Sequence, residues 1–155
     1  YPLGTTLGEL IEHAGGVTGE LHGVLIGGAA GTFASPDELG LVMSFEGLAE
    51  NKYFLGSGVI NVINTTRDMK ALVYSLAHFF AHESCGKCFP CHLGTQKQLE
   101  ILDKVVDEAV TLDDMARLED VGFTMAKASI CGVGHMASTA ILSAYKKWPE
   151  IFIVD

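Results

Sequence analysis

Apolar and polar positions in the first part of the chain form short runs that glycine residues interrupt. Leu7, Leu10 and Ile11 fall on one helical face and Gly15 follows them, which predicts a short helix. Apolar runs bounded by turn residues predict three strands, at Leu21–Ile26, Leu39–Phe45 and Val59–Ile63. Strands beside one short helix indicate a small α+β module.

The apolar period becomes helical near residue 66. Met69, Val73, Leu76 and Phe80 share one face of a predicted helix, for which Thr66 is the expected N-cap. Three further helices are predicted, over about residues 94–109, after Thr111, and over about residues 137–147. We therefore expect two domains, residues 1–66 and residues 67–155, with all the cysteines in two loops between the helices of the second.

The composition of the 155-residue chain limits its partners. Apolar residues make up 48% of the sequence, which is enough for a packed core and unlike a disordered segment. The formal net charge is −9, which argues against nucleic acid and against an anionic membrane surface, because both attract basic proteins. Polar side chains interrupt the densest apolar stretch, Leu72–Phe80, so we expect no direct insertion into a membrane.

The spacing of the four cysteines is the main chemical signal. Cys85, Cys88 and Cys91 repeat every three residues, and Cys131 stands alone further along the chain. A [4Fe–4S] cluster takes one thiolate at each iron, so one short loop can supply three ligands and a remote cysteine the fourth. Zinc also takes four ligands, but usually from two separate cysteine pairs. Disulfides are a third alternative, although the short gaps would close strained rings.

Residues around the cysteines suit a buried cluster. Glycines at positions 86, 94, 132 and 134 would let backbone amides approach sulfur, and such hydrogen bonds raise a reduction potential. Lys87 is the nearest formal positive charge in the sequence, and is either solvated or tunes the potential. His78 and His82 have the spacing of a metal-binding pair, but they lie away from the apolar stripe and are expected to be solvated or to face a partner. No nucleophile–base or paired-carboxylate pattern is present, so no catalytic residue is predicted.

Both cysteine segments resemble those of a known family. Glu83-Ser84-Cys85-Gly86-Lys87-Cys88-Phe89-Pro90-Cys91, followed by Gly94-Thr95, is similar to the cluster motif of the NADH-oxidising flavoprotein subunit of respiratory complex I. The same subunit type occurs in NAD(P)-linked formate dehydrogenases and in soluble hydrogenases, including electron-bifurcating ones. Ser129–Gly134 resembles the second motif of this family, which supplies the fourth ligand, and Pro2–Gly58 resembles its β-grasp module of the soluble-ligand-binding type.

The resemblance implies an α+β chain in which a β-grasp module precedes a four-helix domain with one [4Fe–4S] cluster. Cys85, Cys88, Cys91 and Cys131 would hold this cluster, which would relay electrons between FMN and the iron–sulfur clusters of partner subunits. The FMN- and NADH-binding domain of the family has no counterpart here. We therefore expect FMN and NAD(P)H only in a missing domain or a partner subunit, and do not expect this chain alone to oxidise NADH.

The resemblance also bears on the chain's origin and location. The chain begins at Tyr1 without an initiator methionine, which we interpret as the C-terminal part of a longer subunit, or a form that has lost its flavin domain. We expect a cytoplasmic protein that is peripheral to the membrane through its complex. The alternative function is a structural or docking module whose four cysteines hold zinc and have no redox role.

Two histidines depart from the family pattern. His92 stands where the family usually has arginine, and histidine titrates near neutral pH, so we hypothesise a lower and pH-dependent cluster potential. A solvated histidine that faces water or a partner is the alternative. His135 stands where the family commonly has a polar amide, and the sequence alone assigns it no role.

Overall fold

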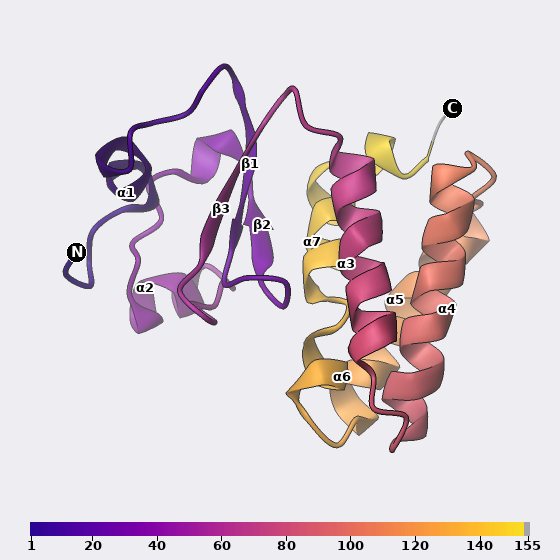
Figure 1. The fold of residues 1–155 in the computed structure, drawn as a ribbon. Helices are drawn as coiled ribbons and strands as arrows, with labels where there is room; N and C mark the ends of the chain where they lie inside the picture. Colours follow the sequence, from indigo (N-terminus) through magenta and orange to yellow (C-terminus); the bar gives the residue numbers. More distant parts are fainter. Residues whose placement is uncertain (154–155) are drawn as a thin grey trace. The chain divides into compact units, whose positions relative to one another are not determined.

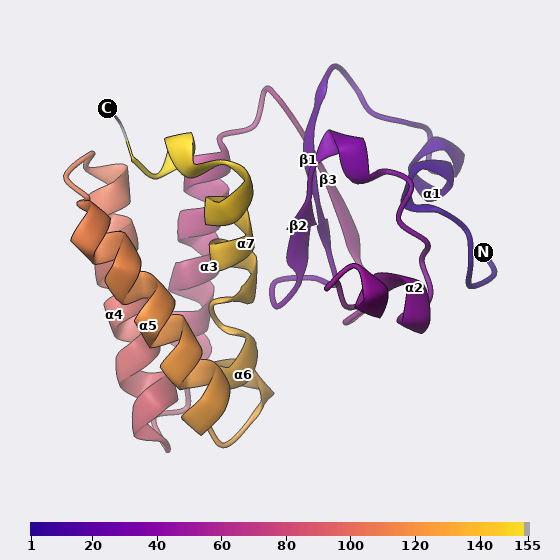
Figure 2. The same ribbon diagram turned by 180° about the vertical axis from the view of Figure 1, so that it is seen from behind.

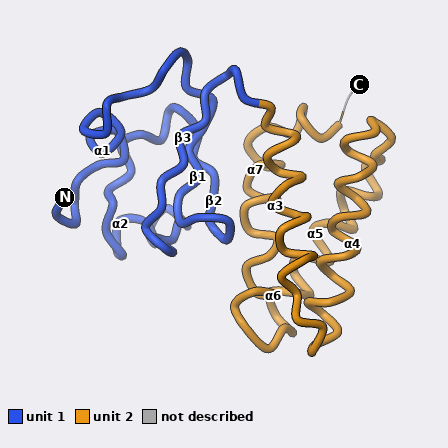
Figure 3. Tube along the Cα trace, in the orientation of Figure 1, with its two compact units in different colours: residues 1–67 blue, residues 68–155 orange. Residues whose placement is uncertain are grey.

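The structure, a computed structural model, describes residues 1–153 as a mixture of α-helices and one small antiparallel sheet (Figure 1). The predicted combination of helix and strand is thereby confirmed. The chain divides into two compact units, the first Tyr1–Arg67 and the second beginning at Asp68 (Figure 3). Within the described residues, no helix is both long and apolar enough to span a membrane.

The first unit is built around a three-stranded sheet in which β1 is the central strand and pairs antiparallel with β2 and β3. Its elements are α1 (Leu7–His13), β1 (Leu21–Ile26), β2 (Thr32–Ala34), a 3₁₀ turn (Pro36–Glu38), α2 (Phe45–Glu50) and β3 (Ile60–Asn64). The buried side chains of its core are Leu7, Ile11, Val24, Ile26, Ala34, Leu41, Met43, Leu48 and Tyr53.

The helix predicted at the start of the chain is α1, and its N-terminus is capped by a reciprocal pair of hydrogen bonds. The Thr6 hydroxyl accepts a hydrogen bond from the Glu9 N–H at 3.3 Å, and the Glu9 carboxylate accepts one from the Thr6 N–H at 2.8 Å. This reciprocal pair satisfies two N–H groups that a helix end leaves without partners. The strands predicted at 21–26 and 59–63 are confirmed as β1 and, shifted by one residue, β3.

The strand predicted at Leu39–Phe45 is wrong. Leu41 and Met43 are buried in alternation, as in a strand, but the segment lies along the start of the chain and not in the sheet. The Leu7 N–H donates to the Leu41 carbonyl at 2.9 Å, and the Met43 N–H donates to the Thr5 carbonyl at 2.9 Å. Residues 41–43 are therefore extended next to the start of α1, whereas Leu39 has helical backbone angles, and α2 begins at Phe45.

The second unit is helical. Its elements are α3 (Met69–Glu83), α4 (Phe89–Val106), α5 (Leu112–Ala128), α6 (Gly132–Met136), α7 (Thr139–Lys147) and a 3₁₀ turn (Pro149–Ile151). α4 packs against α3, α5 and α6, while α7 packs against α3 and α5. The view from behind in Figure 2 shows α5 running alongside α4.

Two helix starts differ from the prediction. The N-cap of α3 is Asp68 and not Thr66, because the Asp68 carboxylate accepts the Ala71 N–H at 3.0 Å. α4 begins at Phe89, five residues earlier than expected, with proline in its first turn. Proline is tolerated there because the first N–H groups of a helix have no partner within the helix. The prediction that all cysteines lie in loops is therefore wrong for the cysteine within α4.

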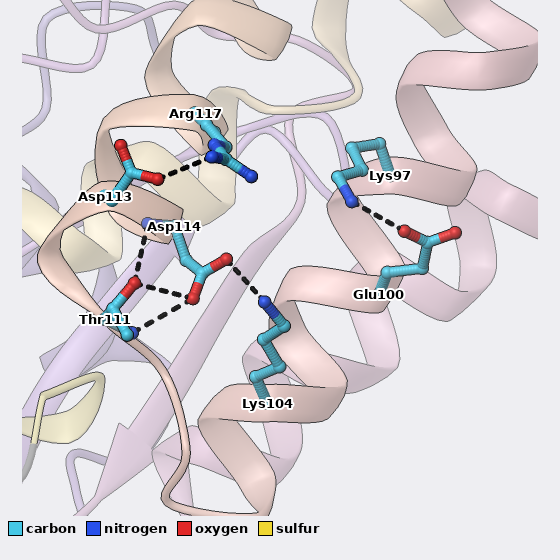
Figure 4. Close-up of polar contacts among 7 residues, drawn as sticks. All are labelled: Lys97, Glu100, Lys104, Thr111, Asp113, Asp114 and Arg117. Carbon is cyan, nitrogen blue, oxygen red and sulfur yellow. Dashed lines mark hydrogen bonds and ion pairs between the residues drawn. The ribbon is translucent and has the colours of Figure 1, made fainter.

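Polar contacts join the end of α4 to the start of α5 (Figure 4). The Thr111 hydroxyl accepts the Asp114 N–H at 3.1 Å, and the Asp114 carboxylate accepts the Thr111 N–H at 3.1 Å. The other Asp114 oxygen accepts a hydrogen bond from Lys104 Nζ at 2.6 Å. The hydrogen bond from Lys104, followed by those from Thr111, lowers the pKa of Asp114 to about 2. α5 is thus capped and tied to α4 by one buried carboxylate.

Candidate metal centre

The four predicted cysteine ligands lie at the ends of helices in the second unit. Cys85 is exposed in the loop after α3, and Cys88 is the N-cap of α4. Cys91 is buried in the first turn of α4, and Cys131 is the exposed N-cap of α6. All four carry free thiols.

Two backbone N–H groups act on the Cys88 thiol. The N–H of Ile130, in the loop before α6, donates a hydrogen bond to this sulfur, as does the N–H of Cys91. These bonds hold the pKa of the Cys88 thiol below its usual value, and the Ser129 side chain acts in the same direction. The N-terminal end of the 18-residue helix α4 adds a partial positive charge. The environment therefore favours the thiolate, which is the form that binds metal.

Cys91 forms the buried part of the site. Its side chain is 5% exposed, and its Sγ lies 3.4 Å from the Ser84 hydroxyl at the end of α3. The Thr95 hydroxyl, one turn further along α4, donates to the Cys91 carbonyl at 2.8 Å. The first turn of α4 is therefore fixed by local hydrogen bonds, and Cys91 is fixed with it.

The loop that carries Cys131 is fixed from α6. His135 Nε2 lies 2.6 Å from the Ser129 carbonyl oxygen, which can only accept, so Nε2 carries the proton. Gly134 faces the same loop, and a Cβ at this position would lie 2.8 Å from Cys91 Cβ and would press on the Ser129 side chain. His135 thus has a structural role that sequence reasoning missed, because the pattern of residues gives no sign that its partner is a backbone carbonyl.

The four glycines expected to admit amides to sulfur have different roles. Gly86 adopts a φ of +74°, a left-handed turn that glycine permits and other residues rarely adopt. Gly94 faces α5, where a Cβ would lie 2.5 Å from a methionine side chain, while Gly132 faces open space. Gly134 packs on Cys91. The amides that reach the Cys88 sulfur instead come from residues other than glycine.

The other predicted site residues are on the surface. Lys87 and His92 are exposed beside the cysteines, and a tuning role for either stays a prediction. His78 and His82 are also exposed, on α3. His82 Nδ1 lies 3.3 Å from the Glu83 carboxylate, which is an ion pair only when the histidine is protonated.

The donor set fits an iron–sulfur cluster. Among the residues that the structure describes, no three His, Cys, Asp or Glu side chains are gathered as they would be around one metal ion. The ligands of a cluster need not converge on one point, because each thiolate binds a separate iron. The two cysteine segments meet where the Ile130 N–H donates to Cys88. Beside them, the buried Ser129 hydroxyl makes no well-formed hydrogen bond within residues 1–153, and the Cys88 thiol is the group on which it acts.

The sequence of this chain is similar to those of known proteins. Residues 71–154 match the family model described as the NADH-ubiquinone oxidoreductase-F iron-sulfur binding region. The chain is 32% identical over 151 residues to an NADH-quinone oxidoreductase subunit of Aquifex aeolicus, and the match covers 96% of this chain and 34% of the relative. It is 30% identical over 145 residues to an NADP-reducing hydrogenase subunit of Solidesulfovibrio fructosivorans, where the match covers 92% of this chain and 30% of that one.

A solved structure is also similar. An NAD+-reducing [NiFe]-hydrogenase, crystallised in the H2-reduced state, matches with a TM-score of 0.87 and 31% sequence identity. The match covers 98% of this chain and 26% of the hydrogenase chain. The chain thus spans about a third of the length of the curated relatives named above.

Proposed function

The chain belongs to the family of NADH-ubiquinone oxidoreductase-F iron–sulfur binding regions, and from this premise we propose that it transfers electrons through one [4Fe–4S] cluster. The proposed ligands are Cys85, Cys88, Cys91 and Cys131. When bound, such a cluster accepts and releases single electrons. The protein's own side chains and backbone orient the ligands and set the environment of the cluster.

One contact carries the proposal: the Ile130 N–H acts on the Cys88 sulfur and lowers the pKa of its thiol, within the residues that match the iron–sulfur binding region. It joins the segment with three cysteines to the segment with the fourth, although the two are separated by all of α4 and α5. Cys131 directly follows Ile130, so this contact supports a position for the remote cysteine near Cys88. The amide donors also favour the negative thiolate and would favour the more reduced state of a bound cluster.

The proposal assigns distinct tasks to the residues around the ligands. Cys88 and Cys91 are oriented by the first turn of α4, and His135 holds the carbonyl of the Cys131 loop. Lys87 and His92 are the charged and titratable side chains at the rim, and we propose that they tune the reduction potential.

The electron donors and acceptors lie outside these residues. We propose that FMN and NAD(P)H bind a domain or subunit beyond this chain, and that partner subunits with iron–sulfur clusters accept the electrons. Exposed apolar side chains next to two of the ligands support docking of a partner: Phe89 is 79% exposed and Ile130 is 76% exposed. We further propose that residues 1–66 form a β-grasp module, that residues 67–155 form the cluster domain, and that the protein is cytoplasmic within a complex.

Metal analysis with EPR tests this proposal. Protein purified without oxygen should contain about four irons per chain and develop an S = 1/2 signal on reduction with dithionite. Cys131→Ser should lose iron and signal, whereas the control His78→Ala, at an exposed position on α3, should retain both. One zinc per chain without a signal would instead support the docking module with a zinc site.

A further inference from the structure

The Ser129 hydroxyl is a buried polar group without a conventional partner. The residue is 8% exposed, and its Oγ makes no well-formed hydrogen bond within the described part of the chain, although the side chain acts on the Cys88 thiol. A buried hydroxyl that loses its hydrogen bonds to water costs free energy, so such groups almost always have a partner in a folded protein. We therefore expect a neighbouring group that becomes a strong hydrogen-bond acceptor for Ser129 only when the cluster is bound.

Sulfur is the acceptor next to this hydroxyl. The Ser129 side chain and the Ile130 N–H both act on the Cys88 thiol as hydrogen-bond donors and lower its pKa. On its other side it lies against Gly134, which in turn packs on Cys91 Cβ. A thiol is a weak acceptor, whereas a thiolate bound to a cluster is a strong one, because hydrogen bonds to charged groups are stronger.

A second serine occupies a similar position at the neighbouring ligand. Ser84 Oγ lies 3.4 Å from Cys91 Sγ, at the end of α3. The two hydroxyls thus approach adjacent ligands from different elements of the chain. Ser84 Oγ lies within hydrogen-bonding distance of its sulfur, whereas Ser129 Oγ makes no well-formed hydrogen bond to the Cys88 sulfur that it acts on.

We infer that Ser129 is a positioning and tuning residue whose hydroxyl donates a hydrogen bond to the Cys88 sulfur of the bound cluster. The inference rests on the proposed function, because it requires the cluster ligands assigned there. A donor to a ligand sulfur stabilises the reduced state, in which the cluster carries one more negative charge. Removing the hydroxyl should therefore make the cluster harder to reduce.

The chain offers a matched control in Ser138. This residue is 5% exposed, and its Oγ also has no hydrogen-bond partner among residues 1–153. It is the N-cap of α7 and lies against Gly122 of α5, in a pocket whose lining residues include no cysteine. Ser129→Ala and Ser138→Ala thus delete the same atom from equally buried positions, and only one of them faces a ligand.

The experiment is a redox titration of the whole protein, followed by the EPR signal of the reduced cluster, with iron measured on each sample. We expect Ser129→Ala to disfavour reduction by about tenfold, which is about 59 mV to lower potential for a one-electron couple. Ser138→Ala should keep the wild-type potential. Ser129→Thr retains a hydroxyl, so its reduction potential should lie close to the wild-type value.

The outcomes separate this inference from the proposed function. Wild-type protein without iron would refute the proposed function itself. A wild-type protein with its cluster and an unchanged potential in Ser129→Ala would overturn the inference alone. Equal shifts in Ser129→Ala and Ser138→Ala would overturn it as well, because the effect would then be one of packing. Loss of iron from Ser129→Ala only would also count against it, since the hydroxyl would be holding the loop and not setting the potential.

Discussion

Gly134 offers a direct test of how α6 positions the fourth ligand. In Gly134→Ala the new methyl group would lie 2.8 Å from Cys91 Cβ and closer still to the Ser129 hydroxyl. Carbon atoms prefer separations of about 3.5–4.0 Å, so α6 must move away from α4 by about 1 Å. Overpacking of this kind costs about 1–3 kcal/mol. The same movement shifts Cys131, which is the N-cap of α6.

Gly132→Ala is the control, because a Cβ at Gly132 meets open space on the same helix. Both changes replace glycine by alanine in α6, so the gain in helix propensity of up to about 1 kcal/mol largely cancels between them. The difference in their free energies of unfolding should therefore be about 1–3 kcal/mol, measured by urea denaturation of the iron-free proteins. Gly134→Ala should also retain less iron after desalting. Equal stability and equal iron in the two variants would refute the packing of α6 on Cys91.

Three further predictions concern stability. Asp114 has its pKa lowered to about 2, so its contribution is present above the ordinary value near 3.8 and is lost as pH falls toward 2. The melting temperature between pH 5 and 2 should therefore depend less on pH in Asp114→Asn than in wild type. The control Asp113→Asn, at an exposed ion pair, should behave as wild type. Thr111→Ala should cost about 1 kcal/mol through loss of the cap on α5, and an unchanged urea midpoint would contradict this. Tyr53→Phe should cost about 1–2 kcal/mol, because the buried Tyr53 hydroxyl donates to Glu38 Oε1 at 2.8 Å; a stability equal to wild type would show that this bond contributes nothing.

Local patterns in the sequence predict most of the regular elements. α1 and β1 are predictable because their signals are local: a capped apolar stripe that ends at glycine, and an apolar run between turn residues. The extended segment at 41–43 has the same alternation as a strand, and only the contacts it makes with residues 5–7 distinguish it. Those contacts are not local, so the residues of the segment itself could not predict them.

The candidate site shows the same division. The spacing of the cysteines is sufficient to propose their roles as ligands, since it is a property of the sequence. The start of α4 is harder to predict, because Cys88 is not among the residues that usually cap helices and Pro90 suits a loop as well as a first turn. The Ile130 amide and the His135 ring act on partners that only the packing of α6 brings near, and no spacing in the sequence predicts them.

The position of two cysteines on one helical turn has a consequence for how iron enters the protein. The separation of Cys88 and Cys91 is fixed by α4, which is held by packing against three other helices. Cys85 lies beyond the left-handed turn at Gly86, and Cys131 belongs to a different helix. The conformational entropy lost on loading therefore falls mainly on Cys85, which is exposed in a loop, since His135 already holds the segment before Cys131. Assembly should begin at the pair on α4 and finish at Cys85, and that last bond would make residues 84–87 resist proteases in the loaded protein more than in the iron-free one.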